Sequence, residues 1–88
     1  MLDSVVRRLK PERMVGHVFR HYKGAYYRVL QIGKHTETSE ALVIYHGKNP
    51  SEIWVRPLTM FNDFVGDGIR RFWWCGPYHN HAAYFYQK

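Results

Sequence analysis

The spacing of short strand-forming stretches constrains the fold of this chain more than any other feature of its sequence. Between residues 17 and 56, β-branched and aromatic residues gather in four stretches separated by short polar turns. We expect strands at residues 17–22, 26–34, 41–46 and 52–56. The turns are too short to hold a crossover helix, so neighbouring strands must pair antiparallel. The sequence therefore predicts an antiparallel all-β domain.

The fourth stretch predicts a buried strand that stops abruptly. Its alternation sends two aliphatic side chains to one face and Trp54 and Arg56 to the other. Pro57 has no N–H to donate to a neighbouring strand, so the strand is expected to end there. The apolar residues 58–61 follow directly and are expected to form a hook that caps the sheet.

The second stretch carries large apolar side chains on both of its faces. Alternation places Tyr27 and Val29 on one face and Leu30 and Ile32 on the other. Such a strand is expected to be central in its sheet. Further along, after a Gly-Asp-Gly turn, residues 69–74 are expected to form a fifth strand.

Three regions follow from this pattern. Residues 1–15 form an N-terminal arm, with a short helix that Pro11 is expected to end. Residues 16–74 are expected to form the β domain, a barrel or a sandwich. Residues 75–88 form an extension so rich in aromatic side chains that we expect it to cover a sheet edge rather than to be solvated coil.

Composition narrows the classes of partner. Among the 88 residues, 13 Lys and Arg against 7 Asp and Glu give a formal charge of +6, which favours anionic partners. The basic residues are scattered, so they also fit ordinary solubilising charge. The single cysteine cannot form an intramolecular disulfide, and without an export signal the chain is expected to be cytoplasmic. No apolar run reaches the roughly 18–20 residues that cross a bilayer, so no membrane association is expected.

The order of several short strings resembles a known bacterial and phage family, domain of unknown function 1653. The strings are Gly16-His-Val-Phe-Arg-His-Tyr-Lys-Gly24, Tyr27-Arg-Val-Leu30, His35-Thr-Glu-Thr-Ser-Glu40, Leu42-Val-Ile-Tyr45 and Trp54-Val-Arg-Pro-Leu-Thr-Met-Phe61. The resemblance covers about residues 16–72 and implies a small SH3-like barrel. It implies no activity, and it leaves the arm and the aromatic extension outside the pattern.

Several polar and aromatic side chains near strand ends are candidates for a binding site. An arginine provides a planar fork for phosphate or carboxylate, and an indole or phenol provides a stacking surface for a base. The candidates are Arg56, Trp54, Tyr45, His21, His35, Lys23 and Glu37. A structural interpretation stays open beside the functional one: Arg56 pairs with Glu37 or Glu40, His35 holds the polar loop 35–40 by hydrogen bonds, and Trp54 fills the core.

The sequence offers little for metal binding or catalysis. His79 and His81 lie two residues apart, but zinc needs about four ligands and the chain has one thiol. Cys75 with His79 is a conceivable nucleophile and base, although a cysteine beside tryptophan is more often an inert filler. We therefore expect no metal, no cofactor and no enzyme activity.

These observations favour a small antiparallel SH3-like barrel of about five strands that acts as a binding protein. The preferred ligand is a small anionic, nucleotide-like molecule held by Arg56 in an aromatic pocket. If the chain is viral, it would sequester a nucleotide signal. The apolar arm and aromatic extension suggest a homo-oligomer. Two alternatives are a DNA- or RNA-binding module and a protein-interaction adaptor.

Overall fold

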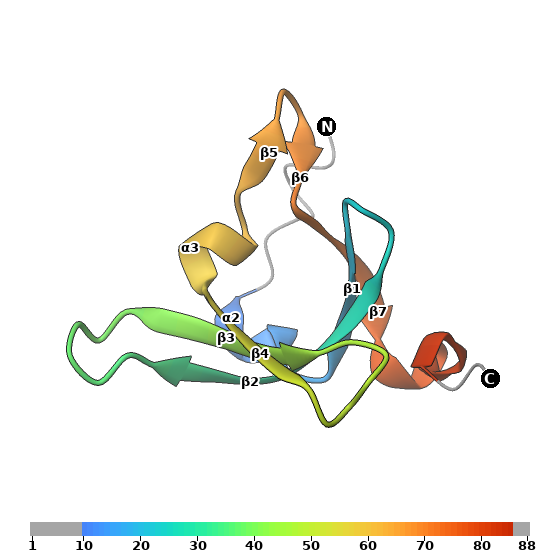
Figure 1. Cartoon of the computed structure of the whole chain (residues 1–88), viewed down its shortest axis with the longest axis horizontal. Helices are drawn as coiled ribbons and strands as arrows, with labels where there is room; N and C mark the ends of the chain where they lie inside the picture. Colours follow the sequence, from blue (N-terminus) through green and yellow to red (C-terminus); the bar gives the residue numbers. More distant parts are fainter. Residues whose placement is uncertain (1–9, 86–88) are drawn as a thin grey trace.

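The computed structural model describes residues 10–85 and shows two antiparallel sheets and several short helical turns (Figure 1). In chain order the elements are α2 (Pro11–Met14), β1 (His17–His21), β2 (Tyr26–Lys34), β3 (Ala41–His46), β4 (Ile53–Pro57), α3 (Leu58–Phe61), β5 (Phe64–Gly66), β6 (Ile69–Arg70), β7 (Phe72–Pro77), and the 3-10 turns η1 (Tyr78–Asn80) and η2 (Ala82–Phe85). Within the described residues, no helix combines the length and apolar character needed to cross a membrane.

The all-β prediction is confirmed, but the main sheet is not a closed barrel. Its five strands run in the order β4-β3-β2-β1-β7, and β5 pairs with β6 in a separate hairpin. The sheet bends sharply, so that β1 and β7 stand at an angle to β3 and β4 (Figure 1). Helix α3 and the β5–β6 hairpin lie on the inner side of this bend. The strands β4 and β7 are left as the two edges of the described sheet.

A bulge in β2 corrects the predicted faces of that strand. Both β2 and β3 have the predicted bounds, but the pairing between them shifts between Val29 and Gln31. Leu30 is therefore an extra residue, which moves every later side chain to the opposite face. Ile32 packs against the core together with Tyr27 and Val29, so its predicted place on the opposite face is wrong.

Strand β4 ends at Pro57 as predicted, but the prediction that it is buried is wrong. Ile53 and Val55 are 48% and 57% exposed because β4 pairs with β3 alone, at the edge of the main sheet. The apolar hook forms one helical turn, α3. Its last residue, Phe61, is 1% exposed and anchors the turn in the core.

The core is a cluster of aromatic rings held by segments far apart in the sequence. The rings of Phe61 and Phe72 stack with centroids 3.9 Å apart and planes 5° apart. Phe19 and Tyr45 meet the Phe61 ring edge-on, at 5.1 Å and 5.5 Å. Edge-to-face and stacked rings of this kind add to the free energy gained by burying apolar area. The Phe61 ring of the hook and the Phe72 ring of β7 thus pack together in the core.

The predicted fifth strand is two strands, β6 and β7, that belong to different sheets. Arg71 lies between them. Its backbone N–H donates to the Asp63 carbonyl at 3.0 Å, and its guanidinium binds the Asp63 carboxylate at 2.7 Å and 3.3 Å. This clamp closes the base of the β5–β6 hairpin, so the chain turns at Arg71 before it joins β1. The prediction of one continuous strand at 69–74 is therefore wrong.

The two ends of the described chain also differ from a simple arm and tail. Pro11 begins the one-turn helix α2, whereas the sequence predicted only a helix end there; the predicted helix before it lies outside the described residues. Proline is well suited to a first helical position because that N–H has no helical partner. In the C-terminal extension, the Tyr78 ring lies 3.8 Å from the Arg28 guanidinium, and the Phe85 ring meets His46. The extension therefore packs against side chains of β2 and β3.

Candidate functional site

Two adjoining cavities open on the inner side of the bent sheet. The larger has a volume of about 440 Å³ and is lined by Ala25, Tyr26, Tyr27, Gly47, Lys48, Glu52 and Trp54. The smaller has a volume of about 210 Å³ and is lined by His21, Tyr27, Tyr45, Trp54, Arg56 and Phe72. Tyr27 and Trp54 line both cavities, so we treat the two as one site and call it the aromatic cleft.

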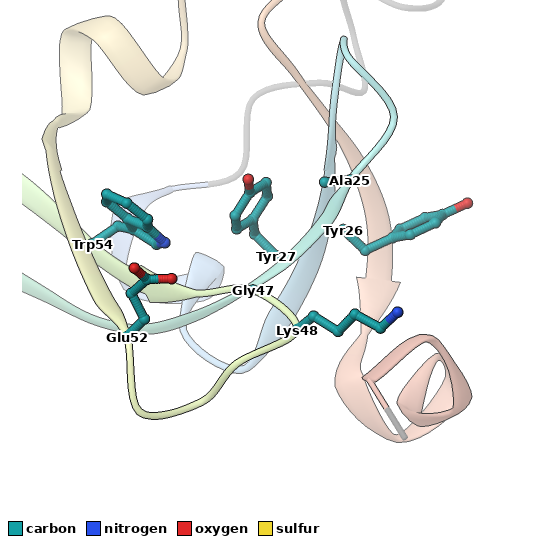
Figure 2. Close-up of a pocket in the computed structure, with 7 residues that line it drawn as sticks. All are labelled: Ala25, Tyr26, Tyr27, Gly47, Lys48, Glu52 and Trp54. Carbon is teal, nitrogen blue, oxygen red and sulfur yellow. The ribbon is translucent and has the colours of Figure 1, made fainter. Parts of the chain in front are cut away.

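Local structure places the aromatic walls of the larger cavity. Figure 2 shows Trp54 of β4 and Tyr27 of β2 on opposite sides of the space, with the turn between β3 and β4 beneath them. Gly47 in that turn lies against the Tyr27 ring, because a Cβ placed there would be 2.9 Å from a ring carbon of Tyr27. A side chain at position 47 would thus push the tyrosine ring out of place.

Arg56 presents its guanidinium to the smaller cavity. Its Nε donates a hydrogen bond to the Tyr45 hydroxyl at 3.2 Å, and its central carbon lies 5.8 Å from the centroid of the Phe72 ring. Within residues 10–85, the structure gives its two terminal nitrogens no hydrogen-bond or ion-pair partner. The expected pairing with Glu37 or Glu40 is absent. The guanidinium is therefore fixed in place and still has donors for an anion.

His21 lies beside Arg56 in the same cavity and is electrically coupled to it. Burial lowers the pKa of His21 below its ordinary value, and the positive charges of Arg56, Lys23 and Arg71 lower it further. Its Nδ1 accepts a hydrogen bond from the Lys23 backbone N–H at 3.2 Å, which places the proton of the neutral ring on Nε2. The smaller cavity thus combines a fixed cation with a neutral imidazole in a positive electrostatic field.

Comparison with known proteins agrees with this architecture. The family model for proteins of unknown function DUF1653 matches residues 17–74. This chain belongs to the DUF1653 family. The crystal structure of a DUF1653 protein from Bordetella bronchiseptica is similar to it, with a TM-score of 0.63 and 28% identity over 77% of this chain and 95% of that chain. No curated protein matches the sequence.

The DUF1653 segment contains the whole aromatic cleft. Every residue that lines either cavity falls between positions 17 and 74. The C-terminal extension, with Tyr78 and Phe85, lies beyond the matched segment. The cleft is therefore built entirely by the part of the chain that defines the family.

The structure brings four of the seven predicted site residues together and leaves three apart. His21, Tyr45, Trp54 and Arg56 line the smaller cavity, and Trp54 is 46% exposed rather than filling the core. The other three, His35, Glu37 and Lys23, line neither cavity.

Each of these three has a different place in the DUF1653 fold. The His35 Nδ1 accepts hydrogen bonds from the backbone N–H groups of Glu37 and Thr38, at 3.0 Å and 3.4 Å, which is the predicted structural role in the loop. This loop lies at the far end of β2 and β3 from the cleft (Figure 1). The Lys23 ammonium lies 5.9 Å from the Tyr22 ring centroid, and Lys23 acts on His21 through its backbone N–H and its positive charge.

Sequence reasoning missed seven residues that line the cleft. They are Ala25, Tyr26, Tyr27, Gly47, Lys48, Glu52 and Phe72. The pairing of β2 with β3 was a usable signal for Tyr27, because β3 lies between β2 and the strand that carries Trp54. The turn residues Lys48 and Glu52 had no signal, since their direction depends on how the turn folds back over the strands.

The structure also places the histidines and the cysteine that the sequence raised as candidates for metal binding or catalysis. Within residues 10–85, no three His, Cys, Asp or Glu side chains gather as metal ligands would. Burial raises the pKa of the Cys75 thiol, which disfavours the reactive thiolate. The histidine that approaches Cys75 is His81, and its Nε2 meets the Cys75 backbone carbonyl at 3.0 Å rather than the sulfur.

Proposed function

We propose that this protein binds a small anionic, nucleotide-like ligand in the aromatic cleft and does not transform it. The observation that carries the proposal is the arrangement at Arg56. One nitrogen of the guanidinium is held by Tyr45, the other two lack a partner among the described residues, and Arg56 lines an open cavity. A guanidinium fixed in this way binds a phosphate or carboxylate with little loss of side-chain entropy.

The aromatic walls favour a ligand that carries a planar ring as well as a charge. Trp54 and Tyr27 present an indole and a phenol on either side of the larger cavity (Figure 2). Base stacking on such rings contributes about 1–3 kcal/mol per base. The cavities adjoin, so a phosphate at Arg56 and a base beside Trp54 belong to one molecule of nucleotide size.

The first experiment is a binding screen by thermal shift and calorimetry. The probes are nucleoside monophosphates, cyclic dinucleotides and short single-stranded oligonucleotides. We expect mononucleotides or cyclic dinucleotides to bind and to be recovered chemically unchanged. Preference for oligonucleotides with a steep salt dependence would instead show a nucleic-acid-binding module, and ligand turnover would show an enzyme.

A pair of matched variants connects binding to the cleft. Arg56→Ala removes the fork, and because hydrogen bonds to charged groups contribute about 1.5–3 kcal/mol, affinity should fall about tenfold or more. Arg13→Ala removes the same charge from an exposed position on α2, away from the cleft, and should leave affinity unchanged. Equal affinities of the two variants would refute the proposed site.

The proposal also includes three predictions from the sequence, namely sequestration of the ligand, self-association and a cytoplasmic location. A binding protein of this kind lowers the free concentration of its ligand, which is the sense in which it would sequester a nucleotide signal. Self-association and a cytoplasmic location stay predictions. Light scattering during size-exclusion chromatography tests the first, and fractionation of the producing cells tests the second.

A further inference from the structure

A carboxylate without a partner lies at one end of a site proposed for an anion. Glu52 lines the larger cavity with Trp54 and Tyr27, and its side chain extends towards the side of the cavity where Trp54 lies (Figure 2). Lys48, on the same turn, extends in another direction. Within residues 10–85, the structure gives the Glu52 carboxylate neither an ion pair nor a hydrogen bond.

The position of this carboxylate orients a ligand in the cleft. Arg56 and His21 lie in the smaller cavity, whereas Glu52 lies in the larger. A phosphate is attracted to the positive charge of Arg56 and repelled by the negative charge of Glu52. The uncharged part of the ligand must therefore lie next to Glu52, with its planar ring between Trp54 and Tyr27.

The chemistry of a carboxylate then distinguishes among the bases. An ionised carboxylate only accepts hydrogen bonds, and its two oxygens can accept two parallel N–H groups. The Watson–Crick edge of guanine offers such a pair, N1–H and the 2-amino group. Adenine and cytosine each place a ring-nitrogen acceptor beside their amino group, and uracil places carbonyls on both sides of its single N–H. Each of these three bases would bring a lone pair against the carboxylate.

We infer that the larger cavity selects a guanine base, with Glu52 accepting hydrogen bonds from N1–H and the 2-amino group. This inference depends on the proposed function, because it assigns the two ends of a nucleotide to the two cavities. Arg56 holds the phosphate, Trp54 and Tyr27 stack on the base, and Glu52 reads its edge. The ligand class is a guanine nucleotide, free or within a cyclic dinucleotide.

The test measures the affinities of GMP, IMP, AMP, CMP and UMP for the wild-type protein and for Glu52→Gln. A well-formed double hydrogen bond gives discrimination of about tenfold or more, so GMP should bind the wild-type protein at least that much more tightly than AMP, CMP or UMP. IMP lacks the 2-amino group and should fall between GMP and the rest. Glu52→Gln replaces one accepting oxygen with a donor, and should abolish the GMP preference while changing AMP affinity little.

Matched controls separate this inference from the proposed function. Glu12→Gln makes the same change at an exposed position on α2 and should keep the GMP preference. Equal binding of all five nucleotides to the wild-type protein, or a uniform gain for all five in Glu52→Gln, would overturn the guanine inference. Binding would still depend on Arg56 in that case, so the proposed function would stand. Failure of every nucleotide to bind would overturn both.

Discussion

The Nε of Arg56 and the hydroxyl oxygen of Tyr45 lie 3.2 Å apart, which connects the edge strand β4 to its neighbour β3 through a side-chain hydrogen bond. Because this bond uses Nε, it leaves the two terminal nitrogens of the guanidinium available for other partners, and Arg56 lines the smaller cavity. Tyr45 is 5% exposed and packs against Phe61 and Phe72, so its hydroxyl is a well-fixed anchor. The position of the fork therefore depends on the aromatic core beneath it.

Removal of that anchor should weaken binding without unfolding the protein. Tyr45→Phe keeps the ring and deletes the hydroxyl that accepts from Arg56. A hydrogen bond of this kind contributes about 1 kcal/mol, so nucleotide affinity should fall about fivefold as the guanidinium gains freedom. Tyr22→Phe deletes a phenol that is 42% exposed and outside the cleft, and it should change nothing. Calorimetry with both variants makes the comparison; unchanged affinity in Tyr45→Phe would mean that the anchor is dispensable.

A glycine in the turn between β3 and β4 should be as important for binding as the rings. Gly47→Ala would place a methyl group 2.9 Å and 3.1 Å from two carbons of the Tyr27 ring, so the ring must move. We expect a loss of nucleotide affinity of about tenfold, because the ring stacks on the base.

The control for Gly47→Ala is a glycine substitution that strains the backbone without touching a neighbouring side chain. Gly68 has a φ of +74° and open space around its Cβ position. Gly68→Ala should therefore cost about 1 kcal/mol of stability through backbone strain alone, which lowers the melting temperature by about 4–8 °C in a domain of this size. Its nucleotide affinity should stay unchanged. If both variants lose affinity in proportion to their stability, Tyr27 has no specific role.

How far the fold follows from local sequence is clearest in β2 and β6. The bounds of β2 are predictable because branched and aromatic residues alternate along it, but nothing in the sequence marks Leu30 as the extra residue of a bulge. Residues 69–74 likewise contain no glycine or proline that would mark a strand end at Arg71. The chain breaks there because Asp63, eight positions earlier, holds Arg71 by side chain and backbone. Interactions between segments, rather than local preference, decide both features.

The same distinction applies to the candidate site. Trp54 and Arg56 share a face because strand alternation is a local property, and Tyr45 joins them because it lies opposite Trp54 on the paired strand. Glu52 comes from a turn whose path only the folded chain fixes. His35 was proposed for the site because of its chemical type and its place near a strand end, and its ring instead holds the backbone of its own loop.

Binding should strengthen as the pH falls. The pKa of His21 is lowered in the free protein, first by burial and then by Arg56, Lys23 and Arg71. A bound phosphate adds negative charge beside the ring and raises that pKa. At a pH between the His21 pKa of the free protein and that of the complex, the protein therefore takes up a proton when it binds. Affinity should therefore rise as the pH falls through this window and level off below the free value. His21→Asn keeps an acceptor for the Lys23 N–H and should flatten the profile.

Proton uptake on binding can be measured directly. Calorimetry in two buffers of different ionisation enthalpy gives the number of protons bound with the nucleotide. The wild-type protein should take up a fraction of a proton near the ordinary histidine pKa, and His21→Asn should take up less. Uptake that is the same in both proteins would assign the titration to another group, such as the phosphate itself.

Stability of the free protein should follow the opposite trend with pH. The pKa values of His17 and His21 are both lowered in the folded protein, chiefly by burial. As the pH falls, the histidines of the unfolded chain therefore bind protons before those of the folded protein do. The free energy of unfolding decreases until the pH is below the histidine pKa values of the folded protein. Stability from this source is complete above the ordinary histidine pKa and is lost as the pH drops through the lowered values. Urea unfolding of wild type and His21→Asn across this range should show a smaller loss in the variant.

The ion pair between Asp63 and Arg71 should have its own pH signature. The hydrogen bond from Arg71 holds the pKa of Asp63 below its ordinary value. The pair's contribution is therefore present above the ordinary carboxyl pKa and is lost as the pH falls through the lowered value. Its side chains are 36% and 22% exposed, so solvent screening keeps the contribution within about 1 kcal/mol. Asp63→Asn should be less stable than wild type to urea at neutral pH, and the two curves should converge in strong acid. Asp67→Asn, in the turn of the same hairpin, should be as stable as wild type throughout. If Asp63→Asn stays less stable than wild type in strong acid, the amide disturbs packing rather than charge.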